Sequence, residues 1–433
     1  MRSSRVAIAI AIAATLASCG APLAPEGQVL LYVDTDAILP PAPGEALTDP
    51  APLFDRLRVE LFVQGEPCAA CTREFTLDHR RTFAGNASFA VLNPSARGSV
   101  VARLRLFRTL GGFVVEPRAT STLEAFVRVP PTSAEGIVRV HVVLHTDDLG
   151  TPRGALDTPI DAEPGPALGR LAGTWASAYR VGCATAPNDD EVCVPGGAYW
   201  MGDPTNEGYP SERLIVVSPF FVNAHEVTVG ELRARRGATL FEPLRRGVND
   251  QCSYTTQPGA NEALPVTCIA RARAASYCAQ TGGALISEAQ WEYLARGRRS
   301  AAYPWGDDVP QCADAVFDRK TTSATCGKTG VGPSPAGQGT RDRVGDVVDL
   351  AGNVMEWMAD EWAKDTETCW RAPLLYDPVC RQPGTADGPS LALRGGNWSD
   401  LAALMHGAYR QHVPTTMAVT VSDTVGFRCA RPL

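Results

Sequence analysis

Residues 349–362 read DLAGNVMEWMADEW, and this stretch decides how the C-terminal half of the chain is interpreted. Acidic side chains, an asparagine, a glycine and two tryptophans follow one another closely. Such a run is typical of a metal or active-site loop that opens a helix, because carboxylate and amide oxygens bind hard cations. It is equally typical of an amphipathic turn that buries its tryptophans. The rest of the sequence is needed to choose between these two interpretations.

The N-terminus has the features of a bacterial lipoprotein signal. A short positive region precedes an apolar stretch over 6–17, which is too short to cross a bilayer comfortably. The stretch closes on Leu-Ala-Ser-Cys, which resembles the lipobox, where the cysteine, here Cys19, is lipidated and becomes the first mature residue. A plain signal peptide that happens to hold a cysteine is the alternative. We expect residues 1–19 to be a lipoprotein signal peptide. Because Gly20 follows instead of aspartate, we expect an outer-membrane lipoprotein, facing the periplasm or the surface.

The composition narrows the class of protein. A length of 433 residues allows two or three domains, and a net charge of −7 offers no basic face for nucleic acid. Thirteen cysteines less the lipidated Cys19 leave an even number in an oxidising compartment, so we expect structural disulfides. The many glycines and prolines predict turns and long ordered loops.

The N-terminal part contains four segments in which apolar and polar residues alternate. They are VLLYVDTD (29–36), RLRVELFV (56–63), SVVARLRLF (99–107) and GIVRVHVVLH (136–145). Alternation of this kind, with Pro/Gly turns between the segments, is typical of half-buried strands. We predict a small all-β sandwich over 28–147. The region 148–182, rich in Pro, Gly, Ala and Asp, is interpreted as a linker.

Two features of the sandwich region raise the question of chemistry. Cys68 and Cys71 form a CxxC, but neither a strand-to-helix redox turn nor two further zinc ligands are near, so a local disulfide is favoured. His141 and His145 are four residues apart, which on a strand separates them by about 13 Å, too far to share a metal. We interpret both as surface histidines.

The region 183–433 contains few helices and many aromatic, glycine-rich loops. Helices are predicted at 270–280 and at EAQWEYLARG, where Ser287 is the N-cap and Gln290 takes the capping-box position. Eight motifs occur in this order: GGAYWMGD, PFFVNAHEVTVGEL, LPVTCIARARAASYC, ALISEAQWEYLARG, YPWGDD, DLAGNVMEW, RGGNWSD and GFRCA. Together they resemble the formylglycine-generating enzyme (sulfatase-modifying factor) family over 193–433. The resemblance implies an α+β, C-type-lectin-like fold with sparse regular secondary structure.

The resemblance also implies a structural calcium ion on the opening stretch. The implied ligands are the carboxylates of Asp349 and Glu356 and the backbone carbonyls of Gly352 and Val354. An all-oxygen set of this kind suits a hard cation. Trp357 and Trp362 would then be core residues that pack the helix following the ion. The alternative is that the two carboxylates are only solvated.

A second calcium site of the family is less well preserved. Asp314 matches one ligand, but Cys326 stands where a carboxylate is expected, and Cys312 lies close by. We hypothesise that a Cys312–Cys326 disulfide replaces this ion, a bridge worth about 3 kcal/mol in the chain-entropy model. Connectivity does not follow from sequence alone, so the other pairs are assigned by analogy with the family and by proximity. They are Cys278–Cys429, Cys252–Cys268, Cys183–Cys193, Cys369–Cys380 and Cys68–Cys71.

The catalytic chemistry of the family does not fit this sequence. The family's oxidase uses two cysteines, five residues apart after the RGG segment, to bind copper as thiolates and convert a substrate cysteine into formylglycine. Here the two positions hold Asp400 and Met405, and no cysteine lies between Cys380 and Cys429. Thiolates select the cuprous ion, and carboxylate or thioether groups do not replace them. We therefore expect no copper.

Two hypotheses for the function follow. In the first, the domain is noncatalytic and binds a peptide, glycan or protein partner in the envelope. Its candidate aromatic contacts are Trp200, Trp305, Trp398 and Tyr409, with core packing as the alternative role of each. A groove is predicted around Trp398, Asp400, His406 and Arg410. In the second hypothesis, the chain is a periplasmic protein-modifying oxidase with an altered site around Asp400, Met405, His406 and Arg410. We adopt the first.

Overall fold

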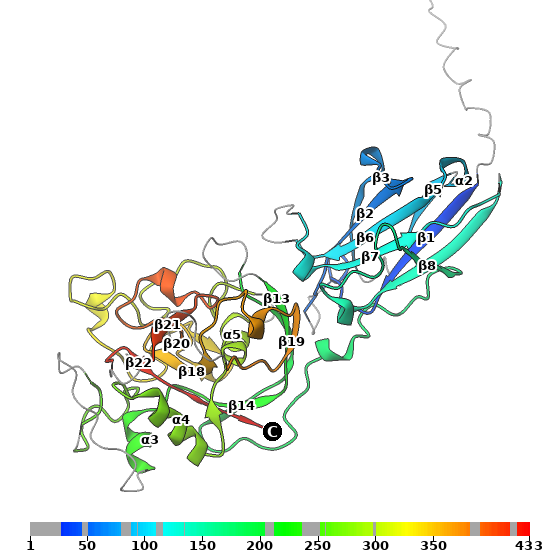
Figure 1. The fold of residues 1–433 in the computed structure, drawn as a ribbon. Coiled ribbons are helices and arrows are strands. Elements are labelled where there is room, and N and C mark those ends of the chain that lie inside the picture. Colours follow the sequence, from blue (N-terminus) through cyan, green and yellow to red (C-terminus); the bar gives the residue numbers. More distant parts are fainter. Residues whose placement is uncertain are drawn as a thin grey trace, which may run out of the picture.

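The structure is a computed structural model of the chain. It describes residues 27–45, 51–78, 88–92, 94–109, 116–133, 135–203, 212–235, 252–255, 257–297, 300–381, 390–415 and 422–433. The predicted signal peptide and Cys19 lie outside these residues. Within the described ranges, no helix is long and apolar enough to cross a membrane. A strand-rich N-terminal domain and a larger C-terminal domain pack against each other (Figure 1).

Two β-sheets form the N-terminal domain. One has the strand order β10-β8-β1-β5, and the other has the order β3-β2-β6-β7-β9 with β4 also paired to β2. The strands are β1 (Gln28–Thr35), β2 (Arg56–Val63), β3 (Glu66–Pro67), β4 (Arg73–Thr76), β5 (Ser88–Leu92), β6 (Val100–Phe107), β7 (Leu123–Arg128), β8 (Ile137–Leu144), β9 (Ile160–Asp161) and β10 (Glu163–Pro164), with a short helix α2 (Pro94–Arg97). The four strands predicted from alternation are all present, and their inward residues, such as Leu31 and Leu104, form one apolar core.

The predicted linker over 148–182 is ordered and packs on the sandwich. Strand β9 pairs with β7, and β10 pairs with β8, so the segment adds one edge strand to each sheet. Trp175 is buried, and its Nε1 donates a hydrogen bond to Asp147 at 2.9 Å. Composition alone could not predict this, because edge pairing satisfies the backbone of almost any extended segment.

His141 is buried in the structure, contrary to the surface position predicted for it. In the register of β8 with β10, His141 faces Glu163, whose carboxylate lies 3.3 Å from Nε2. The edge strand supplied by the former linker therefore covers this histidine. His145 is half exposed, as predicted, and its Nδ1 lies 3.2 Å from the Asp36 carboxylate.

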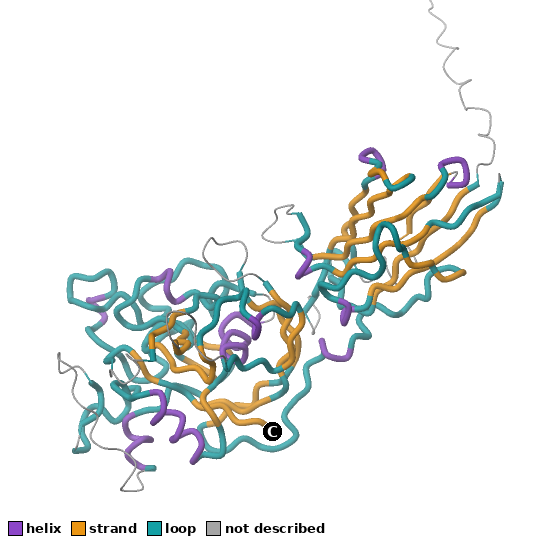
Figure 2. The backbone as a smooth tube through the Cα atoms, viewed as in Figure 1, coloured by secondary structure: helices purple, strands orange, loops and turns teal. Residues whose placement is uncertain are grey.

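The C-terminal domain consists mainly of loops and short strands, as Figure 2 shows. Its strands are β11 (Glu191–Val194), β12 (Gly197–Met201), β13 (Arg213–Val217), β14 (Phe220–Asn223), β15 (Ala284–Leu285), β16 (Arg343–Val344), β17 (Val347–Val348), β18 (Met355–Glu361), β19 (Leu374–Tyr376), β20 (Ser390–Arg394), β21 (Gln411–Pro414), β22 (Val425–Gly426) and β23 (Cys429–Pro432). The sheets have the orders β11-β14-β23-β15, β12-β13-β19, β16-β17 and β21-β20-β18-β22. The fold is α+β, as expected.

The helices of this domain are short. They are α3 (Val229–Ala234), α4 (Arg271–Gln280) and α5 (Glu288–Arg296). The 3-10 turns among the described residues are η1 (Ala69–Cys71), η2 (Ala119–Ser121), η3 (Thr146–Asp148), η4 (Ala176–Ala178), η6 (Gly327–Thr329), η7 (Thr368–Trp370) and η8 (Ala402–Met405). Helices α4 and α5 were predicted, and the capping box of Ser287 and Gln290 starts α5 as expected.

The opening stretch forms a strand, so the helix expected after the metal loop is wrong. Residues 355–361 are β18, which pairs antiparallel with β20 and parallel with β22. Pairing on both sides buries most of the strand and overrides the local pattern. Trp357 is buried as predicted. Trp362 is only partly buried, and its ring stacks on His412 at a centroid distance of 4.0 Å.

The two domains share one hydrophobic core. Ala198, Trp200 and Leu214 of the C-terminal domain belong to the same buried cluster as the sandwich residues. The indole Nε1 of Trp200 donates to the Leu53 carbonyl at 3.1 Å, and the ring packs edge-on against Phe54. We infer that the two domains form one packed unit and are not independent domains joined by a flexible linker.

All six predicted disulfides are present. They are Cys68–Cys71, Cys183–Cys193, Cys252–Cys268, Cys278–Cys429, Cys312–Cys326 and Cys369–Cys380. The Cys312–Cys326 bridge lies where the second calcium site was expected to be lost. Five of the six bridges hold the C-terminal domain, where loops predominate.

Candidate functional site

The predicted calcium loop is organised around a buried arginine. Nε of Arg428 donates to both carboxylate oxygens of Glu356, at 2.9 and 2.8 Å. Its Nη2 donates to the backbone carbonyls of Val348 and Asp349, at 3.0 and 2.7 Å. Arg428 and Glu356 are both almost fully buried. A guanidinium therefore draws together the carboxylate and carbonyls at this end of the loop.

Three further carboxylates in or beside this loop accept hydrogen bonds from backbone amides. Asp342 accepts from the amides of Leu350 and Ala351, at 3.0 Å each. Asp349 accepts from the Gly337 amide at 2.7 Å. Burial, together with repulsion from Asp349, raises the pKa of Asp342 well above its usual range. The carboxylates thus fix loop backbone at an electrostatic cost.

Glu226 is the fourth carboxylate, and the sequence analysis missed it. It accepts from the Val354 amide at 3.1 Å and from Nδ2 of Asn353 at 2.7 Å. Burial raises the pKa of Glu226 well above its usual range, and the nearby charge of Asp349 adds to the effect. The only sequence signal for this role was the position of Glu226 in the second motif. Its partners, Asn353 and Val354, lie more than a hundred residues further along the chain.

The calcium ligands implied by the resemblance, Asp349 and Glu356 with the carbonyls of Gly352 and Val354, stay a prediction, and two of these groups also contact Arg428 or the loop backbone. Both oxygens of Glu356 accept from Nε of Arg428, so the guanidinium already supplies a positive charge to this carboxylate. Across the described part of the chain, three His, Cys, Asp or Glu ligand atoms come within 4.8 Å of one another only at Asp190, His225 and Glu231. The arginine of the GFRCA motif was the signal that could have predicted this arrangement.

The two positions that hold cysteines in the family have become structural. Met405 is fully buried and packs in a cluster with Phe317, Ala351 and Cys326 of the replacement disulfide. Asp400 is partly buried and accepts a hydrogen bond from Nδ2 of Asn397 at 2.6 Å. Burial raises the pKa of Asp400. The position matched to the second thiol is therefore part of an apolar cluster.

The other predicted groove residues are held by the interior. The Trp398 ring is buried, and its Nε1 donates to the Asp423 carbonyl at 3.3 Å. Nδ1 of His406 accepts from the Ala408 amide at 3.1 Å, and its Nε2 lies 3.3 Å from the Asp203 carboxylate. The role predicted for Trp398 as a ligand contact is thus corrected to core packing, and Trp200 is corrected in the same way by its place at the domain interface.

Arg410 belongs to a buried ion network. It donates from Nε and Nη2 to the two oxygens of Glu288, at 2.6 Å each. Arg394 bridges Glu288 and Glu292 at 2.9 Å each, and Arg296 donates to Glu292 at 2.9 Å. Burial alone would raise the pKa of Glu288, but the charges of Arg410 and Arg394 outweigh it and lower that pKa. Arg410 thus has a structural partner and does not face a ligand alone.

One aromatic surface remains accessible beside Asp400, and we call Tyr303, Trp305, Leu401 and Ala402 the Trp305 face. The rings of Tyr303 and Trp305 stack at a centroid distance of 5.1 Å. The Tyr303 hydroxyl donates to the Ala402 carbonyl at 3.4 Å. Leu401 is 63% exposed. This is the part of the predicted groove region that presents apolar groups to a partner.

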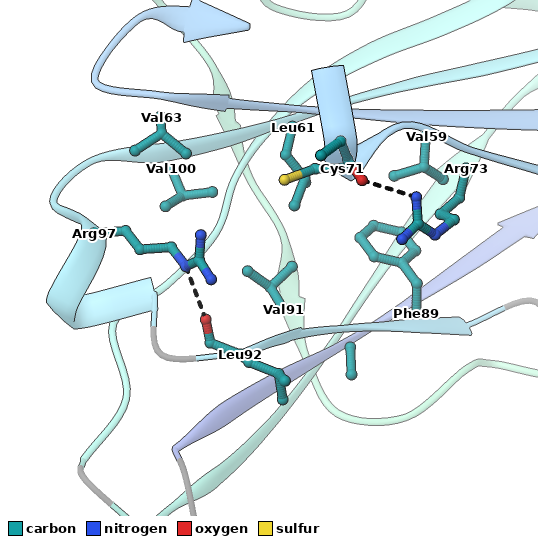
Figure 3. A pocket seen from close by; sticks show the side chains of 12 residues that line it. Val59, Leu61, Val63, Cys71, Arg73, Phe89, Val91, Leu92, Arg97 and Val100 are labelled. Carbon is teal, nitrogen blue, oxygen red and sulfur yellow. Dashed lines mark hydrogen bonds between the residues drawn. The ribbon is translucent and has the colours of Figure 1, made fainter. Parts of the chain in front are cut away.

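The sandwich contains a cavity that the sequence analysis did not predict. It has a volume of about 220 Å³ and lies between the sheets, lined by apolar side chains such as Leu61, Phe89 and Val91 (Figure 3). Two arginines border it, and Nε of Arg97 donates to the Leu92 carbonyl at 3.2 Å. A cavity of this kind arises where the two sheets separate, so strand patterns carry no signal for it.

Comparison with known proteins places the C-terminal domain. Residues 180–433 match the family model of the sulfatase-modifying factor enzyme 1-like domain. The inactive C-alpha-formylglycine-generating enzyme 2 of Bos taurus is 27% identical over 307 residues, covering 61% of this chain and 93% of that protein. The formylglycine-generating enzyme of Mycobacterium tuberculosis is 30% identical over 293 residues, covering 55% and 96%. PvdO from Pseudomonas aeruginosa is a solved structure with a TM-score of 0.43 and 23% identity, covering 58% and 96%.

Proposed function

We propose that the chain is a lipid-anchored envelope protein whose C-terminal domain is noncatalytic and binds a partner. The chain belongs to the sulfatase-modifying factor family through residues 180–433. This proposal rests on the two positions at which the family's oxidase has its copper-binding cysteines. Met405 is buried beside the Cys312–Cys326 bridge, and every cysteine after Cys19 is in a disulfide. A cuprous ion has no thiolate to bind in such a domain.

Family membership alone does not require the oxidase reaction. The Bos taurus relative is named as an inactive formylglycine-generating enzyme, so the family includes members without that activity. In this chain, the residues around the former site are used for stability: Arg410 binds Glu288, and Met405 fills the core. These contacts support a scaffold role better than an altered oxidase site.

The Trp305 face is the surface that we propose for binding. Stacked aromatic rings give a large, rigid contact area at a low cost in side-chain entropy, and such rings are enriched at protein interfaces. Here Tyr303 and Trp305 stand next to the exposed Leu401. A protein or peptide segment with an apolar side chain fits this surface beside Leu401.

The lipid anchor is proposed from Cys19 and the lipobox-like segment before it. Attachment there places the sandwich nearest the outer membrane along the chain, with the family domain beyond it. Metabolic labelling with a radioactive fatty acid tests this point. Label should enter the wild-type chain and be absent from Cys19→Ser, and equal labelling of both proteins would contradict lipidation at this residue.

A mass-spectrometric assay separates the noncatalytic proposal from the alternative of an altered protein-modifying oxidase. The purified chain is incubated with cuprous ion, oxygen and a cysteine-containing peptide. We expect no copper-dependent change in the peptide mass. A thiol count on the denatured, unreduced and lipidated chain should find no free thiol, because the lipid occupies the sulfur of Cys19 and the other cysteines are paired. Copper and oxygen alone oxidise thiols to disulfides, so a protein-free mixture is the control. Conversion of the peptide cysteine to an aldehyde only when the chain is present would favour the oxidase.

Binding at the Trp305 face is tested in cells by site-specific photo-crosslinking. A photoreactive amino acid at position 401 should give a discrete crosslinked product, because Leu401 is exposed beside the aromatic pair. The product should disappear when Trp305→Ala is added. Position 344 on β16 is the matched control, since Val344 is also exposed but lies on a separate hairpin. Identical products at both positions would contradict a specific role for this face.

A further inference from the structure

A second group of metal-ligating side chains lies at one end of the β11–β14 pair. Asp190 directly precedes β11, and His225 follows β14 by two residues. Because the strands are antiparallel, with Glu191 opposite Asn223, these two positions meet at the same end of the pair. The Ala224 amide donates to the Asp190 carbonyl at 2.8 Å, which fixes this approach.

The third member of the group comes from helix α3. Glu231 occupies the N3 position of α3, and its Oε2 accepts from the backbone amide and the hydroxyl of Thr228, at 2.7 and 2.9 Å. The capping box therefore holds one carboxylate oxygen and leaves Oε1 directed toward His225. The ligand atoms of Asp190, His225 and Glu231 all lie within 4.8 Å of one another.

The imidazole of His225 is oriented for a cation. Its Nδ1 lies 2.9 Å from the Glu226 carbonyl, so Nδ1 is the protonated donor and Nε2 carries the lone pair. A backbone carbonyl bound to one ring nitrogen is the usual way in which a protein fixes a ligating histidine. Nε2 lies 3.9 Å from Oε1 of Glu231, which is too long for a hydrogen bond. Two ligands on one tetrahedral zinc ion, each at about 2.1 Å, are about 3.4 Å apart, so the observed gap is close to that of a shared cation.

A polar cavity adjoins two of the three side chains, those of Asp190 and Glu231. It has a volume of about 210 Å³ and is lined by Asp190 and Glu231 together with Asn188, Asp189 and Asn223. Arg235 also borders it, and Glu191 on its wall is paired with Arg431 at 2.7 Å. The unpaired charge that faces the cavity is therefore mainly negative. The space accommodates the waters that complete the coordination shell of a metal with three protein ligands.

We propose that Asp190, His225 and Glu231 form a binding site for one divalent transition-metal cation, with Zn²⁺ as the best match. One imidazole nitrogen and two carboxylate oxygens suit Zn²⁺ better than Ca²⁺, which prefers oxygen alone. The ion joins β11, β14 and α3 on the protein side and is open toward the cavity. The three ligands are not those predicted for calcium, although His225 adjoins Glu226 of the Arg428 loop. The site does not depend on the proposed partner-binding role.

Zinc titration of the full-length chain, purified without a histidine tag and freed of metal by chelation, tests the proposal. We expect one saturable Zn²⁺ site per chain by isothermal titration calorimetry. Co²⁺ at the same site should give a visible absorption band that Zn²⁺ abolishes. Absence of saturable binding, or many weak sites without a 1:1 component, would overturn the proposal.

The variants separate ligation from folding. Glu231→Gln keeps the capping box of α3, because glutamine serves equally at N3, but it removes the charged ligand. We expect this variant, His225→Ala and Asp190→Asn each to weaken Zn²⁺ binding at least tenfold. His145→Ala is the matched control, since it breaks another exposed histidine–aspartate pair, that with Asp36, and should bind Zn²⁺ normally. Unchanged affinity in Glu231→Gln and His225→Ala would overturn the site.

Discussion

The two domains stabilise their interiors in different ways. In the sandwich, strands such as β1 and β6 alternate their side chains, and the core cluster is apolar, although a few polar groups such as Asp34 and His141 are also buried. In the C-terminal domain, some of the most deeply buried side chains are charged, Arg394, Glu288, Arg428 and Glu356 among them. The comparison teaches that a domain with few long strands and helices needs polar side chains to satisfy its loop backbone.

The buried charges of the C-terminal domain act on the main chain as well as on each other. Arg428 binds two loop carbonyls, and Arg394 donates to the Gly407 carbonyl at 2.9 Å. In the sandwich, the same backbone groups are paired within the sheets, as between β2 and β6. Taking ions out of water is costly, so such networks are stable only while every member keeps its partner. This difference can be tested by breaking each kind of interior.

The largest effect is expected from Arg394→Met in the ion network. The substitution leaves Glu288 and Glu292 short of a buried partner, so the free energy of unfolding should fall by about 3–5 kcal/mol. Urea denaturation followed by tryptophan fluorescence measures the change. The control is Arg128→Met, whose pair with Asp161 is exposed on the sandwich and should contribute no more than about 1 kcal/mol. Equal effects of the two substitutions would show that the buried network is not special.

A smaller loss is expected from Leu104→Ala in the sandwich. Leu104 is fully buried, and truncation leaves a cavity that typically costs about 2–5 kcal/mol, with the lower part of this range expected where neighbours relax into the gap. Because Trp200 joins both domains to one core, the variant should still unfold in one transition. Leu92→Ala, at a half-exposed position, is the control. Two separate transitions in the wild-type chain would contradict the shared core.

The sandwich was the easier region to predict, and the reason is physical. Strand alternation is a local consequence of burying one face, so Leu57 and Val59 could be assigned to the core from their own neighbourhood. The order of eight motifs predicted the C-terminal fold, and the pairing of Cys312 with Cys326 followed from the resemblance. The helix assigned after the opening stretch was wrong, because strands β20 and β22, which pair with β18, come much later in the chain.

The site was harder to predict because its contacts are long-range. The ion pair of Glu356 with Arg428 was missed, because Arg428 lies 72 residues further along the chain. Trp398 and Trp200 were candidate contacts, and both are buried by elements that their local sequence does not indicate. A motif states which residues are present, whereas the partner of a buried charge depends on the packing of the whole domain.

A pH dependence should distinguish the charged interior from the apolar one. Burial, with the charge of Glu288 as a second cause, raises the pKa of Asp360 from 3.8 to about 7. Between these values the folded chain holds a proton that the unfolded chain has released, so stability should rise as pH falls from 7 toward 4. The slope for this group is at most about 1.4 kcal/mol per pH unit. Asp342 and Glu226, whose pKa values are also raised, act in the same direction.

The pH prediction is measured as the free energy of unfolding in urea at pH 7, 6 and 5. The variant Asp360→Asn should be less stable at all three values, because it loses one of two backbone acceptors, but its slope with pH should be flatter. The slope, rather than the absolute stability, is the diagnostic. A wild-type stability that decreases steadily from pH 7 to pH 5 would show that Asp360 is ionised in the fold over this range.

The smallest effect is expected from calcium at the opening stretch. Since Arg428 already neutralises Glu356, addition of Ca²⁺ or its removal with EGTA should leave the melting temperature unchanged within about 1 °C. Scanning calorimetry of the wild-type chain with added Ca²⁺ and with an excess of EGTA measures the difference in melting temperature. The comparison variant is Arg428→Met, which leaves Glu356, Asp349 and Glu226 without their shared cation and should be strongly destabilised. If Ca²⁺ raised the melting temperature of the wild-type chain, and Asp349→Asn abolished that rise, the ion would bind beside the guanidinium. The loop would then be held by two cations, and the contrast between the two interiors would be greater than the protein contacts alone imply.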